Sequence, residues 1–261
     1  SVEPYINNEA SFASQRGRSN CCDNLEVLGV HTDGGMRERF IVPARKLHPS
    51  HGGLEMEQLA LVETLAIGCH AVDRAKPTAD DTVLIIGAGP IGLTCVEFTR
   101  LTPAKMIVMD MNEDRLAFCR NNMNVEKTVT FKGDDSEEQA LRDANGGELP
   151  TIVIDATGNA QSMANAMNFV AHTGTLVYVG ITLGDIVFPH RWLHAKEMNL
   201  LSSRNALPGD FARIIKLIED GKIDTRPWIT HRTTLEELPE VFDSYTKPET
   251  GVIKAIVSIQ D

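Results

Sequence analysis

Continuously apolar runs alternate with amphipathic stretches through the middle of the chain. Residues 82–88 (TVLIIGA) are typical of a parallel strand that is buried on both faces. Helical spacing follows over 91–101, and 105–110 (KMIVMD) predicts a second buried strand. Further strand-like runs occupy 127–131, 151–157, 174–181 and 199–203, and further helical ones occupy 113–122, 136–144 and 208–223. This alternation predicts an α/β fold with a doubly wound parallel sheet.

The two ends of the chain show a different pattern. Over 25–47, apolar and polar residues alternate around a Gly-rich turn, which predicts β-strands. Residues 56–75 have the spacing of one helix, while 234–245 and 251–259 predict a helix and a closing strand. We expect 56–224 to form the domain with the parallel sheet. Residues 1–55 and 225–261 should together form a second, partial β-domain.

A glycine motif connects the first buried run to the helical segment after it. Gly87, Gly89 and Gly92 form G-x-G-x-x-G, which is specific for dinucleotides when it joins a strand to a helix. Gly87 allows the tight turn, Gly89 lets the backbone approach a pyrophosphate, and Gly92 brings the helix close to the sheet. The helix N-terminus then attracts the anion. We expect Pro90 and Ile91, inside the motif, to contact the cofactor as well.

Asp110 ends the second predicted strand, 18 residues after Gly92. A carboxylate there accepts hydrogen bonds from the adenosine ribose and repels a 2′-phosphate, which favours NAD over NADP. Met111 follows it, and Arg115 is expected to line the adenine side of the site. The alternative is that Asp110 only caps the next helix.

Composition narrows the class of protein. The 261 residues are 42% hydrophobic and carry a net charge of −11, which predicts a packed core and argues against nucleic acid as the main partner. Five cysteines without a repeating framework fit a reducing compartment. Because no apolar run is long enough to span a bilayer, we expect a cytoplasmic protein without a membrane partner.

Several segments in order along the chain resemble one family. They are GRSNCC, DGGMRERFIVPARKLHPS, LVETLAIGCHAV, VLIIGAGPIG with VMDMNEDRL, and VIDATGN. The chain resembles the medium-chain zinc-dependent alcohol and polyol dehydrogenases, and its segment from 202 to 223 is most similar to members such as galactonate, idonate or sorbitol dehydrogenases. The resemblance implies a Rossmann domain that binds NAD and a GroES-like β-domain, partial here, that holds a catalytic zinc. Such a zinc polarises the alcohol oxygen, so that hydride leaves to the nicotinamide.

The resemblance also implies further cofactor contacts. Thr157 follows the 151–157 strand at a turn beside the cofactor, and the other positions are Val179, Gly180, Ile181, Arg204, Asn205 and Lys254. Val179 and Ile181 have the alternative of being plain core residues. Lys254, which would reach the pyrophosphate, has the alternative of being a solvated strand residue.

Glu63 matches a glutamate that many family members place at or near the catalytic metal, and its alternative is a helix-surface residue. The remaining ligands of the family, a Cys and a His–Glu pair, have no matching pattern here. We expect the first quarter of a typical member to be absent from this chain. Because catalytic zinc sites use three protein ligands, zinc is doubtful in this chain.

Asn8, Ser11, Ser14 and Cys22 stand where the resemblance implies four cysteines around a structural zinc. Hydroxyl and amide oxygens are poor substitutes for thiolates as zinc ligands. We therefore predict a vacated structural site, and a loop that is mobile unless hydrogen bonds replace the metal.

The sequence predicts an NAD-dependent, zinc-type dehydrogenase that oxidises a secondary alcohol of a polyol or sugar acid. We expect this chain to be inactive alone. The alternative is a non-catalytic NAD-binding remnant, a sensor or scaffold. A zinc-free reductase ranks third, since neither Tyr5, Tyr178 nor Tyr245 lies in a recognisable acid motif. We expect a homodimer or homotetramer that pairs through the sheet edge near 174–181.

Overall fold

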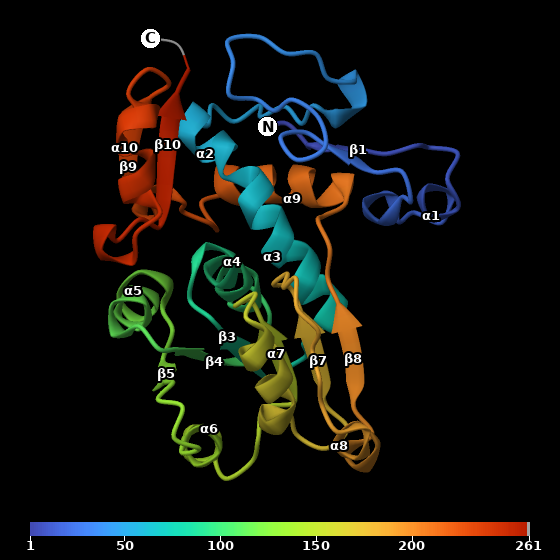
Figure 1. Ribbon diagram of the computed structural model, residues 1–261, viewed down its shortest axis with the longest axis vertical. Coiled ribbons are helices and arrows are strands. Elements are labelled where there is room, and N and C mark those ends of the chain that lie inside the picture. The colour runs from blue at the N-terminus through green and yellow to red at the C-terminus, as the bar shows by residue number, and fades with distance from the viewer. Residues whose placement is uncertain (260–261) are drawn as a thin grey trace. The chain divides into compact units, whose positions relative to one another are not determined.

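The computed structural model describes residues 1–259, which form two compact units (Figure 1). One unit is continuous, from Ile67 to Arg204. The other combines Ser1–Ala66 with the chain from Asn205 onward. In the part of the chain that the structure describes, no helix combines the length and apolarity needed to cross a membrane.

A six-stranded parallel sheet organises the unit 67–204. Its strands are β3 (Thr82–Ile86), β4 (Lys105–Asp110), β5 (Lys127–Thr130), β6 (Ile152–Asp155), β7 (Thr175–Tyr178) and β8 (Asn199–Ser202). Their order in the sheet is β5-β4-β3-β6-β7-β8, and every neighbouring pair is parallel. The chain therefore starts at the centre, winds to one edge, returns, and winds to the other. This doubly wound order confirms the predicted α/β class.

Helices cover the sheet (Figure 1). They are α4 (Pro90–Thr99), α5 (Glu113–Met123), α6 (Glu137–Ala144), α7 (Ala160–Asn165) and α8 (His190–Lys196), with the 3-10 turn η3 (Ala166–Phe169). Helices α4 and α5 contact each other and the strands β3, β4 and β5, whereas α6 packs with η3. The last part of α3 (Val62–Ala75) also belongs to this unit.

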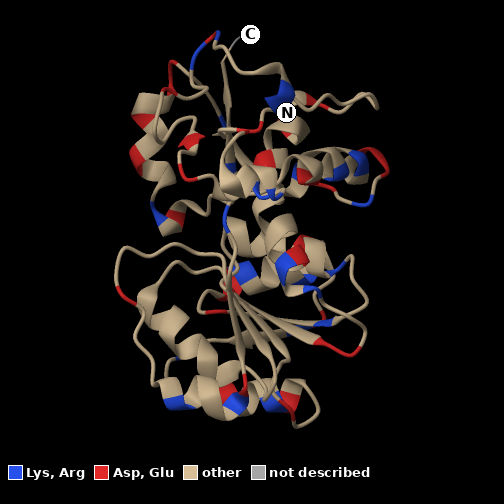
Figure 2. Cartoon of the chain, turned by 90° about the vertical axis from the view of Figure 1, so that its right-hand side faces the viewer, with Lys and Arg blue, Asp and Glu red and all other residues tan. Residues whose placement is uncertain are grey.

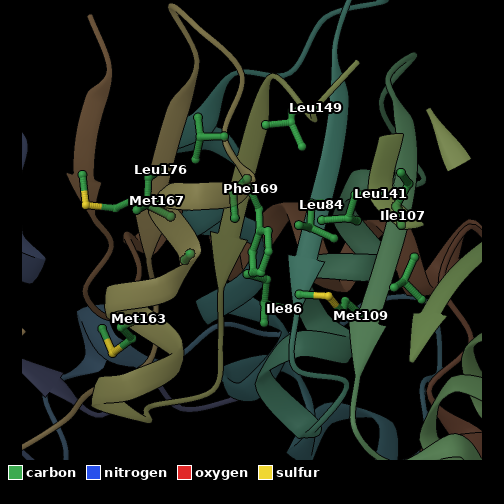
Figure 3. Close-up of a cluster of buried hydrophobic side chains, with 14 of the residues drawn as sticks. Leu84, Ile86, Ile107, Met109, Leu141, Leu149, Met163, Met167, Phe169 and Leu176 are labelled. Carbon is green, nitrogen blue, oxygen red and sulfur yellow. The ribbon is translucent and has the colours of Figure 1, made fainter. Parts of the chain in front are cut away.

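The main core lies between the sheet and the layer of α6, α7 and η3 (Figure 3). Leu84 and Ile86 of β3 pack there with Met163 and Phe169. The alternate strand residue Ile85 is equally buried and points to the opposite face, because successive side chains alternate. Burial on both faces explains the continuous apolar run, and each such side chain contributes about 1.5–3 kcal/mol.

The unit that contains both chain ends has two small sheets. Its strands are β1 (Tyr5–Ile6) antiparallel to β2 (Glu26–Val27), and β9 (Ile229–Thr234) parallel to β10 (Lys254–Ser258). Its helices are α1 (Phe12–Gln15), α2 (Met56–Ala60), the first residues of α3, α9 (Pro208–Glu219) and α10 (Leu238–Tyr245). Short 3-10 turns occupy η1 (Ser19–Cys21), η2 (Ala44–Lys46), η4 (Arg226–Trp228) and η5 (Pro248–Thr250).

A buried polar network fixes the start of the chain within this unit. Glu3 is fully buried and pairs with Lys46, and its second oxygen lies 3.2 Å from Nε2 of His48. The His48 ring stacks on Phe211 of α9, with 4.8 Å between the ring centroids. Because an unpaired buried charge is costly, each member of this network depends on the others.

Some predicted elements differ from the structure. The strands expected over 25–47 reduce to the two residues of β2, and Ile41 is 98% exposed. Alternation alone does not make a sheet without a partner strand to pair with. The helix expected over 56–75 is divided into α2 and α3 at Leu61. Strand β9 and helices α7 and α8 were not anticipated.

The compact units divide after residues 66 and 204, so α9 belongs with the chain ends. The sequence placed this helix in the nucleotide-binding domain. The predicted domain assignment, 56–224 against 1–55 with 225–261, stays a prediction. Charged residues of both signs are interspersed on helices and loops, while the central strands are mostly uncharged (Figure 2).

Candidate functional site

The glycine motif forms the predicted turn from β3 into α4. Gly87 has φ +92, a left-handed conformation, and its N–H donates to the carbonyl of Met109 at 2.8 Å. A Cβ on Gly92 would lie 1.7 Å from the carbonyl oxygen of Gly87, so only glycine fits there. Gly89 is the N-cap of α4 and Pro90 is its first residue, a favourable place for proline.

The N-terminus of α4 is open and lies near a cation. The nearest atom to a Cβ placed on Gly89 is Nη1 of Arg115, at 3.8 Å. Gly89, Pro90 and Ile91 are all partly exposed. Unpaired backbone N–H groups, the helix dipole and a guanidinium group together favour an anionic group at this position.

Asp110 lies at the carboxyl end of β4 and is buried. Its Oδ2 accepts a hydrogen bond from the N–H of Ala88 at 2.6 Å, and its Oδ1 accepts one from Asn112 at 2.8 Å. The alternative N-cap role is wrong, because Asn112 caps α5 and accepts from the N–H groups of Asp114 and Arg115. Asp110 thus ties the glycine loop to β4, a link that sequence reasoning missed. Met111 beside it is 77% exposed.

A second carboxylate, Asp155, orders the turn after β6. Its Oδ1 accepts from the N–H and the hydroxyl of Thr157, at 2.9 and 2.7 Å, and its Oδ2 accepts from Ser162 at 2.8 Å. Burial raises the pKa of Asp155 above its ordinary value, although these hydrogen bonds oppose the shift. Thr157 itself is exposed at this edge. Asp155 was not among the predicted site residues, and its only signal was its place at the end of an apolar run.

The segment after β7 packs closely on that turn. A Cβ on Gly180 would lie 2.3 Å from the nitrogen of Gly158, so the two backbones meet there. Val179 is buried, which agrees with the core alternative, whereas Ile181 is 85% exposed and does not fit it.

Two orphaned polar atoms flank Arg204, which is exposed just beyond β8. Ser203 Oγ and Asn205 Nδ2 are buried without a hydrogen-bond partner within residues 1–259. Asn205 also adopts a left-handed backbone conformation, with φ +51. Buried polar atoms are normally paired, so each of these two atoms is an exception that the hydrogen bonds of the described residues do not explain.

The candidate cofactor residues within 67–204 follow the carboxyl ends of parallel strands. The glycine motif follows β3, Asp110 ends β4, Thr157 follows β6, and Val179–Ile181 follow β7. The carboxyl ends of parallel strands share one edge of the sheet, and the strand order reverses between β3 and β6. This switch point is where open α/β sheets bind their ligands.

Glu63 of α3 has a partner that the sequence did not indicate. The Tyr5 hydroxyl donates to Glu63 Oε1 at 2.5 Å, across 58 positions of the chain. Burial of Tyr5, together with the nearby Glu63, raises the pKa of Tyr5 above its ordinary value. Glu63 is half-buried and lines a cavity of about 720 Å³, whose other lining residues are Ser1, Val2, Leu47, His48, Pro49, Met56, Leu59 and Ala60.

The residues described around Glu63 do not by themselves complete a catalytic zinc site. Within the described chain, Glu63 belongs to no group of three or more His, Cys, Asp or Glu side chains close enough to share a metal. Three protein ligands are the usual minimum. Lys254, at the start of β10, is half-buried rather than solvated. Its burial lowers its pKa, and Glu63 acts against that shift. Contact between Lys254 and a pyrophosphate stays a prediction.

The loop expected to resemble a structural zinc site does not fit zinc either. Only Cys22 offers a thiol, and Asn8, Ser11 and Ser14 offer neutral oxygens. Hydrogen bonds join Asn8 to Cys22, Ser11 to Asn8 and Ser11 to Ser14, which is the condition under which the sequence predicts an ordered loop without metal.

Comparisons with known proteins agree with this architecture. Residues 90–220, from α4 to the end of α9, match the zinc-binding dehydrogenase family. L-galactonate-5-dehydrogenase of Escherichia coli is 35% identical over 257 residues, which cover 98% of this chain and 75% of that protein.

Solved structures show the same fold. A short chain alcohol dehydrogenase of Escherichia coli, complexed with NADH, has a TM-score of 0.91 at 25% identity and covers 99% of this chain and 76% of its own. A structure from Sinorhizobium meliloti, described as a zinc-binding dehydrogenase and bound to NADP, has a TM-score of 0.90 at 26% identity with the same coverage. The chain belongs to the zinc-binding dehydrogenase family.

Proposed function

We propose that this protein is an NAD-dependent, zinc-type dehydrogenase that oxidises a secondary alcohol of a sugar acid or polyol by hydride transfer. The proposal that the protein binds NAD is supported by one main observation. The glycine loop, Gly87–Gly92, is held against Asp110. The similarity to an L-galactonate dehydrogenase supports a polyhydroxylated substrate.

Each part of the dinucleotide has a proposed contact. The pyrophosphate lies at the N-terminus of α4, where Gly89 leaves room for it and Arg115 supplies a positive charge. The nicotinamide end lies along Thr157 and the segment 179–181, and Arg204 and Asn205 complete this end.

The ribose of the adenosine half binds Asp110. An ionised carboxylate has about four acceptor positions, and backbone N–H groups occupy two of them. Two positions therefore remain for the ribose hydroxyls. A 2′-phosphate would meet a buried negative charge, which favours NAD over NADP.

We further propose that this chain alone binds NAD with little turnover. Among the described residues, Glu63 alone matches a catalytic metal position of the family, and its carboxylate accepts a hydrogen bond from Tyr5. The same contact favours the second candidate function, a non-catalytic NAD-binding sensor or scaffold. The five free cysteines support a cytoplasmic location, and we propose a homodimer or homotetramer.

The cofactor proposal is tested by titrating NADH and NADPH into the chain and following nicotinamide fluorescence. NADH should bind at least about tenfold more tightly than NADPH, which corresponds to about 1.4 kcal/mol. Gly92→Ala should abolish binding, since its Cβ overlaps the Gly87 carbonyl. Gly209→Ala is the matched control, because no atom lies within 4 Å of its Cβ and the residue lies in α9. Equal affinity for both cofactors would refute the ribose role of Asp110.

Turnover is tested separately with a panel of polyols and aldonates, with and without added zinc. The chain alone should give little NADH. A version extended by the part of the relatives that the present sequence does not cover should restore activity. Equal activity of the two versions would contradict the proposal that this chain is inactive alone, and inactivity of both would favour the sensor or scaffold.

A further inference from the structure

The loop from Asn7 to Cys22 is closed by hydrogen bonds between side chains. Ser11 Oγ donates to Ser14 Oγ at 2.9 Å, and Asn7 Nδ2 donates to the same oxygen at 2.9 Å. Ser11 is also the N-cap of α1, where its Oγ accepts from the N–H of Ser14 at 3.2 Å. The two serines therefore form one compact polar centre.

Cys22 joins this centre from the other end of the loop. Its side chain is 1% exposed, and its Sγ accepts a hydrogen bond from the N–H of Asn8 at 3.4 Å. The backbone also brings Ser11 next to Asn8, because the N–H of Ser11 donates to the carbonyl of Asn8 at 3.1 Å. The buried sulfur therefore has a backbone hydrogen-bond partner without a metal.

We propose that this loop is a metal-independent closure, in which hydrogen bonds between Ser11 and Ser14 and between Asn8 and Cys22 replace a zinc ion. We further propose that its geometry still accepts zinc once thiolates replace the three oxygen side chains. The proposal concerns the unit that holds the chain ends. It is independent of NAD binding and of catalysis.

The chemistry of the four side chains supports the metal-free state. One thiolate and three neutral oxygens make a weak site for zinc, which prefers several Cys or His ligands. Hydrogen bonds between small polar side chains satisfy the same buried groups without a charge to neutralise. Gly17, with φ +73, lets the chain reverse direction after α1 and return toward Cys22.

The wild-type test measures thermal unfolding of the whole chain with a chelator and with added zinc. The chelator should leave Tm unchanged, and added zinc should not raise it. Ser11→Ala should lower Tm, Ser11→Thr should restore it by returning the hydroxyl, and Cys21→Ala should change little because Cys21 is exposed. A Tm that falls on chelation, or one zinc per purified chain that is lost in Cys22→Ser, would overturn the proposal.

The second part of the proposal, that the loop geometry still accepts zinc, is tested with a triple-cysteine variant. It combines Asn8→Cys, Ser11→Cys and Ser14→Cys with Cys21→Ala. Tetrahedral zinc with Zn–S bonds of about 2.3 Å needs sulfur atoms about 3.8 Å apart. The four positions are already close, since Ser11 Oγ lies 2.9 Å from Ser14 Oγ and the backbone N of Asn8 lies 3.4 Å from Cys22 Sγ. This variant should bind one Co²⁺ per chain with the absorption of tetrathiolate coordination, and zinc should raise its Tm. Adding Cys22→Ser should remove the tetrathiolate spectrum. A folded triple-cysteine variant that binds no metal would overturn the proposal that the loop geometry accepts zinc. If that variant does not fold, the wild-type test still decides whether the loop closes without metal.

Discussion

Asp110 combines an observed structural role with a proposed role in binding the cofactor. Its two oxygens accept backbone N–H groups from Ala88, in the glycine loop, and from Asn112, at the start of α5. The carboxylate therefore holds the loop and the next helix in register, and two of its about four acceptor positions are left for the proposed ribose contact. A substitution here should affect both folding and cofactor affinity.

Asp110→Ala should weaken NADH binding by about 1.5–3 kcal/mol, the range for hydrogen bonds to a charged group. It should also lower Tm, because the N–H groups of Ala88 and Asn112 lose their acceptor. Fluorescence titration and thermal unfolding measure the two effects separately. Asp114→Ala is the matched control, an exposed acidic residue on α5 that should leave NADH affinity unchanged. Unchanged affinity in Asp110→Ala, with a lower Tm, would leave Asp110 a purely structural role.

Spacing after a glycine motif was enough to select Asp110 as a candidate from the sequence, because the strand–turn–helix unit is local. Its role in binding the cofactor stays a prediction. The pairing of Glu63 with Tyr5 could not be found in this way, since 58 positions separate them and no periodicity links a two-residue strand to a helix. Asp155 was also missed. Its partners Thr157 and Ser162 are nearby, but a buried carboxylate at a strand end has no distinctive sequence pattern.

Helix α6 shows what determines where an element begins. Ser136 at its N-cap makes no capping hydrogen bond, and the carboxylate of Glu137 instead accepts from the N–H groups of Lys132 and Gly133 at 2.7 and 2.6 Å. Burial alone would raise the pKa of Glu137. The two backbone donors outweigh it and hold the pKa below its usual value.

Glu137→Gln should reduce the free energy of unfolding at pH 7 by about 1–3 kcal/mol. Because the folded-state pKa is depressed, this stabilisation is present above the unfolded value of about 4.5 and is lost as the pH falls through the folded value. Denaturant unfolding from pH 7 to pH 2 should therefore show the variant and wild type converging in acid. Glu138→Gln, which removes a surface pair with Arg142, should cost about 0.5 kcal/mol or less. A difference for Glu137→Gln that does not change with pH would contradict this account.

The elements predicted well are those with a strong local signal. The buried strands β3 and β4, and helix α9, were expected within a few residues of their observed bounds. The prediction of strands over 25–47 was wrong, because an alternating pattern forms a strand only where another strand can pair with it. The expected 56–75 helix divides at Leu61, where the sequence has no proline or glycine to indicate a break.

At the scale of the whole molecule, the sheet order shows which strand is free to pair. The sequence placed the pairing edge at 174–181 or its neighbours. Because β7 lies between β6 and β8, the edge on that side is the neighbouring strand β8. Its Leu200 is 39% exposed. An edge strand with an exposed apolar residue is prone to pair with another chain, and a two-fold axis would pair β8 with its own copy.

Leu200→Lys should convert the proposed dimer into a monomer, because a two-fold axis at β8 brings two lysine charges together and removes two apolar contacts. A tetramer built on this interface should fall to a smaller assembly for the same reason. Size-exclusion chromatography with light scattering measures the mass directly. Leu101→Lys is the matched control, since Leu101 is 40% exposed but follows α4 rather than lying in an edge strand, and it should leave the mass unchanged.

NADH titration of the Leu200→Lys variant then separates assembly from cofactor binding, because no predicted cofactor residue lies in β8. A wild-type monomer, or a Leu200→Lys variant with the wild-type mass, would refute β8 as the pairing edge.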